Sequence, residues 1–153
     1  MADLTSQDKN NSAVKHALHT RAALATGNYH RFFRLYNESP NMGAYLMDMF
    51  VDRERLAAVA SISRASVTRA SSFNHHPADQ LDRYKPDVKV DFLTEEIGFV
   101  DDAQTAQFIC DHGGQALLEQ KPDGVRFSSG RAGNIFDIAK QQAFRGVDIK
   151  GQI

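Results

Sequence analysis

Large apolar residues with helical spacing, interrupted once by a proline, dominate the first third of the chain. Four aromatic residues take the positions i, i+3, i+4 and i+7 that share one helix face: Tyr29, Phe32, Phe33 and Tyr36. Pro40 ends this helix, because the residue before a proline is excluded from helical backbone angles. The same spacing begins again with Met42, Tyr45, Leu46 and Met49. Two helices joined this closely are expected to pack antiparallel as a hairpin, and neither carries a catalytic set of residues.

The composition is typical of one soluble globular domain. The 153 residues are 42% hydrophobic and 24% charged, and a chain of this length can bury a sizeable core. A net charge of −1 predicts no general attraction to nucleic acid or anionic membranes, so such binding would need a local patch. The single cysteine, Cys110, excludes an internal disulfide and fits a reducing compartment. The sequence has no membrane-spanning apolar run and no signal-peptide core, so we expect a cytosolic or nuclear protein.

The first half is expected to be a small stack of helices behind a short leader. Residues 1–11 are polar and unpatterned, which predicts a disordered leader. The helical part is predicted over residues 12–64. Ser12 is a suitable N-cap for its first helix, which should end before Gly27.

Two further helices and an irregular segment are predicted next. The second helix, capped by Gly27 or Asn28, should reach about Glu38, and the third should run from about Asn41 into the sixties. Residues 65–83 lack a sustained period and are interpreted as an inserted loop, with translated intron sequence as one origin that transcript sequencing can test. The stripe predicted for the third helix comprises Met42, Tyr45, Leu46, Met49, Leu56 and Ala60.

Residues 84–146 show the element order of a winged helix, followed by a tail at 147–153. A short strand is predicted around Lys89, which alternates with two valines. Asp91 is expected to cap a short helix that Gly98 closes, and Asp101 to open another helix that ends at two glycines.

A β-hairpin and a last helix complete this half. Strand-like residues 116–120 and 125–128 flank Pro122-Asp123-Gly124, a turn sequence whose residues favour the required backbone angles. An amphipathic helix is then predicted from Ile135, Phe136, Ile138, Ala139 and Phe144. The predicted fold is therefore mainly α, a helical stack followed by a winged helix with a small β-hairpin.

Candidate chemical sites are weak in this sequence. His16 and His19 lie three residues apart on a helix, but no third metal ligand stands near them, so surface or core roles are favoured. A second weak metal candidate, in the predicted loop, comprises His75, His76, Asp79 and Asp82. Cys110 is better interpreted as a small buried hydrophobe. No nucleophile elbow or phosphate loop is present, and the chain is predicted not to be an enzyme, with no cofactor or metal.

The basic residues of the second half form the more useful pattern. Candidate nucleic-acid contacts lie before the first short helix and on or after the hairpin: Lys89, Lys121, Arg126 and Arg131. A winged helix often presents a helix and its hairpin to nucleic acid, with cations on phosphates. Glu119 and Asp123 interrupt the patch, so from charge alone solvated surface cations are slightly favoured.

Several of these segments resemble the GANP/Sac-three family of PCI-domain proteins. The run from Gly27 to Tyr36, the run from Pro40 to Phe50 and Arg53-Glu54-Arg55 are similar to the central signature of the family. Leu93-Thr94-Glu95-Glu96-Ile97-Gly98-Phe99 resembles its winged-helix entry. The ending from Phe144 to Ile153 looks closest to the fungal Thp-three branch, which is related to leukocyte-receptor-cluster proteins.

This resemblance implies a fold and a function. The fold would be a TPR-like helical stack with a C-terminal winged helix, here an N-terminally short PCI domain because family members carry further helices upstream. The function would be that of a nuclear scaffold in messenger-RNA elongation, processing and export, partnered by a second, Csn-twelve-like PCI protein and the small acidic Sem-one/DSS-one protein. Paired winged helices would bind RNA or DNA.

The resemblance also implies roles for particular residues. The wing cations become the favoured contacts to nucleic acid. Leu117, Phe127 and Phe136 become candidates for the fold and for a partner-facing edge. The alternative is a purely structural subunit, as in the proteasome lid or the signalosome, without nucleic-acid contact.

Overall fold

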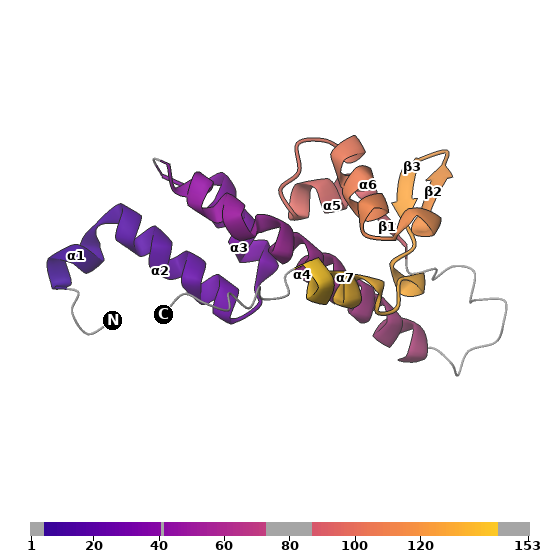
Figure 1. The fold of residues 1–153 in the computed structure, drawn as a ribbon, viewed down its shortest axis with the longest axis horizontal. Coiled ribbons are helices and arrows are strands. Elements are labelled where there is room, and N and C mark those ends of the chain that lie inside the picture. The colour runs from indigo at the N-terminus through magenta and orange to yellow at the C-terminus, as the bar shows by residue number, and fades with distance from the viewer. Residues whose placement is uncertain (1–4, 41, 73–86, 144–153) are drawn as a thin grey trace, which may run out of the picture.

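The computed structural model describes residues 5–40, 42–72 and 87–143, which form an elongated molecule. Helices α1 and α2 lie at one end and the small sheet lies at the other (Figure 1). A single long helix, α4 (Gly43–Ser72), runs between them. The mainly helical fold with a C-terminal winged-helix-like part, which the sequence predicted, is confirmed.

The first three helices begin and end at recognisable capping residues. Helix α2 (Ser12–Ala25) is capped by Asn11, whose side chain accepts from the amide of Ala13, so Ser12 is the first helical residue rather than the cap. Helix α3 (Tyr29–Asn37) is capped by Asn28, as predicted. Gly27 lies between them at φ +63°, a left-handed turn that favours glycine.

The predicted disordered leader is partly helical. Helix α1 (Ser6–Asn10) begins with a capping box, in which Thr5 and Asp8 bond each other's backbone amides. This local exchange of hydrogen bonds satisfies amides that would otherwise lack partners. The leader prediction is therefore wrong for Ser6–Asn10, while residues 1–4 lie outside the described part of the chain.

Helix α4 is longer than predicted. It continues through residues 65–72, which were interpreted as the start of a loop, so that interpretation is wrong for these eight residues. The serines that weaken the helical signal are held by the helix itself: buried Ser63 donates to the carbonyl of Val59, and Ser66 donates to the carbonyl of Ile62. The remainder of the predicted loop, 73–83, lies outside the described residues.

The winged-helix part follows the predicted order. Strand β1 (Val88–Lys89) leads into helix α5 (Val90–Glu96) and helix α6 (Asp102–Asp111). Asp101 caps α6 as predicted, because its carboxylate accepts from the amide of Gln104 at 2.8 Å. Asp91 does not cap α5; it lies within the first turn, after the N-cap residue Lys89.

A three-stranded antiparallel sheet completes the wing. Strands β2 (Leu118–Lys121) and β3 (Gly124–Phe127) form the predicted hairpin, and β1 pairs with the other side of β3. Gly124 has φ +119°, which the tight turn requires and glycine tolerates. Residues 115–117, partly predicted as strand, form a 3-10 turn instead.

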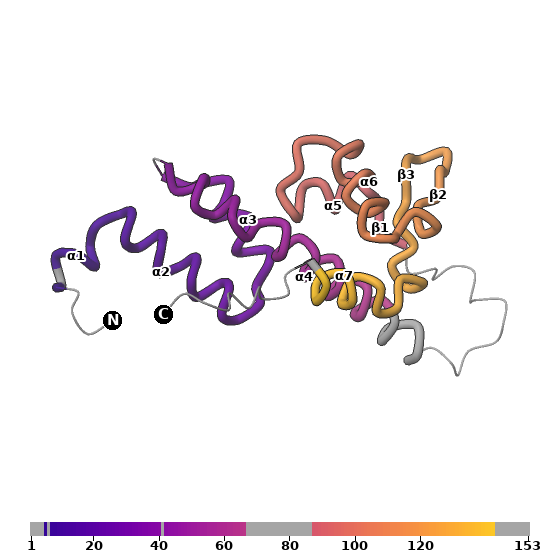
Figure 2. The backbone as a smooth tube through the Cα atoms, viewed as in Figure 1, coloured from indigo at the N-terminus to yellow at the C-terminus, as the bar shows by residue number. Residues whose placement is uncertain are grey.

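The last helix, α7 (Ile135–Ala143), packs against the second half of α4, so the chain returns to the helical stack after the wing (Figure 2). Phe136 at the start of α7 is buried and meets Phe127 of β3 edge to face at 5.7 Å. Phe144, also predicted in this helix, lies outside the described residues. The core is therefore shared between the stack and the wing.

Candidate nucleic-acid and partner surfaces

Three of the predicted nucleic-acid cations lie close together on one side of the sheet. Lys89 is on β1, Lys121 ends β2, and Arg126 lies on the central strand β3, where it stands opposite both Lys89 and Glu119. Arg131 lies in the 3-10 turn after β3. The structure therefore brings Lys89, Lys121 and Arg126 onto the same small sheet, with Arg131 just after its central strand.

Carboxylates within the wing pair with these cations. Asp87 accepts from Lys121 Nζ at 2.5 Å and from Arg126 Nη1 at 3.0 Å, and Asp123 accepts from Arg126 Nη2 at 2.6 Å. Burial raises the pKa of Asp87, but the hydrogen bond from Lys121 and the charge of Arg126 outweigh it, so its pKa lies below the ordinary value. Asp87 stands one residue before β1, and its pairing with the wing cations was not predicted from the sequence.

The remaining two cations are also paired. Arg131 donates to Glu119 at 3.0 Å, and Lys89 lies 4.0 Å from Asp123. Exposed pairs of this kind are screened and weakly bound, so Arg131 can exchange its partner for a phosphate at small cost. Arg126 is more enclosed, with 24% of its side chain exposed, and its first role is to hold the wing together.

The surrounding charge does not favour an anionic ligand. Residues 87–143 contain ten Asp or Glu and five Lys or Arg. Helix α6, which stands where a winged helix presents its recognition helix, contains no Lys or Arg and begins and ends with an aspartate. Helix α6 therefore lacks the cations that a helix in a nucleic-acid groove normally uses, and among the described parts of the wing they lie on or beside the hairpin.

The three predicted partner-edge residues lie inside the chain. Leu117 is 5% exposed, and Phe127 and Phe136 are essentially buried. All three belong to the hydrophobic core that joins β3 to α7. This corrects the prediction of a partner-facing edge, because a side chain packed against its own fold is inaccessible to another chain in this conformation.

An exposed apolar stripe lies elsewhere, on the first turns of α4. Met42, Tyr45, Leu46 and Met49 are 68–80% exposed. The opposite face of the same turns carries Met47 and Val51, which are buried. The sequence grouped these four residues with Leu56 and Ala60 in one stripe, but only Leu56 and Ala60 are buried, since the first turns of α4 use their other apolar face against α3.

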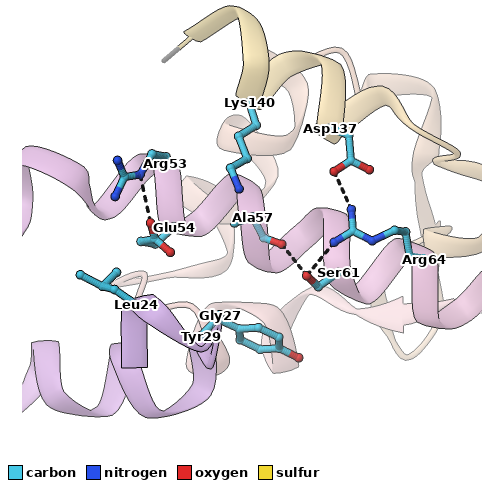
Figure 3. Close-up of a pocket in the computed structure, with 10 residues that line it drawn as sticks. All are labelled: Leu24, Gly27, Tyr29, Arg53, Glu54, Ala57, Ser61, Arg64, Asp137 and Lys140. Carbon is cyan, nitrogen blue, oxygen red and sulfur yellow. Dashed lines mark hydrogen bonds and ion pairs between the residues drawn. The ribbon is translucent and has the colours of Figure 1, made fainter. Parts of the chain in front are cut away.

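A cleft of about 460 Å³ opens where the α2–α3 turn, α4 and α7 meet (Figure 3). Its wall carries charged side chains in pairs: Arg53 with Glu54 at 3.0 Å, and Arg64 with Asp137 at 2.5 Å. Ser61 donates to the carbonyl of Ala57 four residues back. The Arg64–Asp137 pair joins α4 to α7, whereas the other two contacts lie within α4. None of these contacts places a general base beside Ser61.

The other candidate groups also have structural partners. His16 bonds through Nε2 to the carbonyl oxygen of Leu35 at 2.8 Å, which joins α2 to α3. Cys110 is half-buried rather than fully buried. In the part of the chain that the structure describes, no three His, Cys, Asp or Glu side chains cluster as a metal site would require, and the His75–Asp82 candidate lies outside that part. Within the same ranges no helix combines the length and apolarity needed to cross a bilayer.

A helical stack that runs directly into a winged-helix-like part, with a long helix common to both, is the arrangement expected for the C-terminal end of a PCI domain. Comparison with known proteins specifies the group further. The sequence model described as the SAC3/GANP family matches residues 1–116, and the chain belongs to this family.

Individual relatives agree with this assignment. The chain is 33% identical to the THP3 homolog of Schizosaccharomyces pombe over 153 residues, all of this chain and 33% of that protein. It is 36% identical over 99 residues to SAC3 family protein A of Arabidopsis thaliana, and 33% identical over 109 residues to the leukocyte receptor cluster member 8 homolog of Xenopus laevis. The match to the Arabidopsis protein covers 65% of this chain and 8% of that protein, and the match to the Xenopus protein covers 71% of this chain and 11% of that protein. The chain thus spans a third or less of these relatives, and no solved structure matches it.

Proposed function

We propose that the chain is a non-enzymatic subunit of a nuclear complex in messenger-RNA biogenesis, serving elongation, processing or export. It would assemble with a second PCI-domain protein and a small acidic protein of the Sem-one type, and present its winged helix to nucleic acid. Membership of the SAC3/GANP family and the PCI-type fold support this proposal.

The exposed stripe on α4 is the observation that carries the assembly role. A helix with apolar residues on all sides is normally buried on all sides. Each large apolar side chain left in water forgoes roughly 1.5–3 kcal/mol of burial free energy. The stripe has the i, i+3, i+4, i+7 spacing that an amphipathic helix recognises, so its proposed occupant is a helix of the second PCI protein.

Charge introduction into the stripe tests this assignment. We expect Leu46→Glu with Met49→Glu to abolish co-purification with the second PCI protein, and to leave the thermal unfolding temperature within a few degrees because both side chains are already exposed. Val100→Glu is the matched control, since Val100 is 84% exposed on a different surface. Retention of the partner by the double variant would contradict the assignment.

The nucleic-acid role rests on the wing cations, and the observed ion pairs allow a sharper test than charge reversal. Substitution of Arg126 would leave Asp87 with one cation fewer and disturb the sheet. Glu119→Gln instead removes the carboxylate that pairs with Arg131, and Asp123→Asn removes the carboxylate that pairs with Nη2 of Arg126. If the wing binds phosphate, these variants should strengthen salt-dependent binding of RNA by the assembled complex, and Lys121→Gln with Arg131→Gln should weaken it. If both pairs of variants bound RNA as the parent does, the wing would be rejected as the RNA-binding surface.

A purely structural scaffold is the second candidate function. The ten carboxylates of residues 87–143 and the paired state of every wing cation favour it. On this alternative the complex would assemble fully while showing no salt-dependent RNA binding. The same binding measurement therefore decides between the two candidates.

A further inference from the structure

The two ends of the molecule carry opposite charge. Residues 12–37, which form α2, the turn and α3, contain four Lys or Arg, three His and no Asp or Glu. This basic hairpin lies toward one end of the molecule, and the wing lies at the other (Figure 2). The near-zero net charge of the whole chain conceals this separation, because the acidic wing half cancels it.

The cations of the basic hairpin are available to a ligand. Lys15, Arg21, Arg31 and Arg34 are all exposed. His30 of the hairpin contacts Glu96 at 2.7 Å. Of the four Lys and Arg side chains, only Arg34 forms an ion pair with another described residue, a 3.7 Å contact with Glu38 in which both side chains are mostly exposed. Such a pair contributes little to stability and yields readily to a competing anion. By contrast, Lys89, Lys121, Arg126 and Arg131 of the wing each lie within 4.0 Å of a carboxylate that also belongs to the wing.

The fold holds these cations on a rigid support. Helix α3 is anchored through Phe32 and Phe33, which are buried in the core, and Arg31 and Arg34 lie on its exposed side one turn apart. The bond between His16 and the carbonyl of Leu35 fixes α2 against α3. The guanidinium groups therefore project from a fixed surface, which limits the entropy lost when they bind.

The chemistry of this surface fits nucleic acid better than a protein. No large apolar residue of α2 or α3 is among the strongly exposed side chains of the described chain, whereas a protein interface needs an apolar centre. The exposed positions between the cations include Ala17, Ala22 and Ala25, which allow a backbone to approach closely. Nucleic-acid interfaces are more polar and more basic than protein interfaces, and arginine pairs well with phosphate.

We propose that the basic hairpin of residues 12–37 is a binding surface for the phosphate backbone of RNA, separate from the wing. This inference rests on the proposed nucleic-acid role, and it moves the main phosphate contacts from the winged helix to α2 and α3. Binding there is independent of sequence, since the contacts are to phosphates, and it weakens with salt.

The test is binding of a fluorescent 20-nucleotide oligouridine to the full chain, measured by anisotropy over a series of KCl concentrations. In Lys15→Gln/Arg31→Gln/Arg34→Gln we expect the slope of log affinity against log salt to fall by about 2, since each lost phosphate contact removes roughly 0.7 for single strands. Affinity at the lowest salt should fall at least tenfold. Lys15→Arg/Arg31→Lys/Arg34→Lys retains the charges and should bind within about threefold of the parent, which separates charge from folding.

Each other outcome overturns the inference in a distinguishable way. If the glutamine variant binds normally and Lys121→Gln/Arg131→Gln does not, the wing is the phosphate surface and the proposed function stands without the hairpin. If the parent chain and its assembled complex both fail to bind, the nucleic-acid proposal falls together with the inference. If an oligoglutamate of equal charge displaces the RNA as well as unlabelled RNA does, the hairpin is a site for acidic protein.

Discussion

Arg55 is the residue whose loss should most clearly separate the two halves of the molecule. Its guanidinium lies at the end of α5, where Nε donates to the carbonyl of Ile97 at 3.2 Å and Nη2 donates to the carbonyl of Gly98 at 2.6 Å. The same group lies 3.9 Å from the centre of the Phe99 ring. Arg55 therefore closes α5 from the side of α4, and 15% of its side chain remains exposed.

The magnitude follows from these contacts. Hydrogen bonds from a charged donor contribute roughly 1.5–3 kcal/mol each when largely shielded from water, and a cation over a ring adds about 0.5–2 kcal/mol. Because the contacts share one side chain and do not add fully, we expect Arg55→Ala to lower the free energy of unfolding by about 3–4 kcal/mol. Arg55→Lys keeps the charge but cannot reach both carbonyls, and it should cost about half as much.

Urea unfolding followed by far-ultraviolet circular dichroism provides the measurement. Arg53→Ala is the matched control on the same helix, because among the described residues Arg53 pairs only with its neighbour Glu54, and its side chain is 43% exposed. That variant should lose less than about 1 kcal/mol. If Arg55→Ala were no more destabilising than Arg53→Ala, the argument that Arg55 ties α5 to α4 would be refuted.

Three further predictions concern the core, a turn and the wing. Phe136→Ala should lower the free energy of unfolding by about 3–5 kcal/mol in urea unfolding, while Ile138→Ala, at a more exposed position of α7, should lose less than about 1.5 kcal/mol; similar losses would contradict the core assignment. Gly98→Ala should cost more than Gly133→Ala in the same assay, because both have positive φ but only Gly98 would place a Cβ 3.2 Å from an aromatic ring; equal losses would contradict this. The lowered pKa of Asp87 stabilises the fold above the ordinary value of 3.8, and this contribution is lost as pH falls through the folded pKa. Asp87→Asn should therefore destabilise at pH 7, and the difference from the parent should shrink as pH falls below 3.8; a gap that is constant with pH would oppose it.

Local chemistry explains which elements the sequence predicted well. The turn at Pro122-Asp123-Gly124 has residues suited to its backbone angles, and the hairpin follows without help from the rest of the fold. The Asn28 cap and the aromatic face of α3 are equally local. In each case a few neighbouring residues carry both the signal and the interaction.

Tertiary contacts explain the elements that the sequence did not predict. Residues 65–72 contain serines and a threonine that weaken helical propensity, yet α4 continues there, with α7 and the turn after β3 packed on its second half. Ser66 Oγ lies 2.8 Å from Ser129 Oγ, a pairing across 63 positions that no local pattern encodes. The exposure of the stripe has a similar cause, because α4 is apolar on two faces and the position of α3 decides which face is buried.

The basic residues of the candidate site could be predicted from the sequence, but their ion pairs could not. Lys121 and Arg126 lie on the predicted hairpin and Arg131 just after it, whereas the pairing of these cations with Asp87 and Glu119 depends on how the strands pack together. The basic hairpin was available from the sequence as a run of 26 residues without an acidic side chain.

Helix α4 joins every surface discussed above. Its first turns carry the exposed stripe, Arg55 at its middle holds α5, and Arg64 near its end bonds Asp137 of α7. With these contacts along one helix, a partner bound to the stripe would be held at a fixed position relative to both the wing and the basic hairpin. The hairpin and the wing lie toward opposite ends, so a short RNA can occupy only one of them (Figure 1). If both contact phosphates in the assembled complex, affinity should rise in a step once the RNA is long enough to span them, and a gradual rise would indicate a single surface.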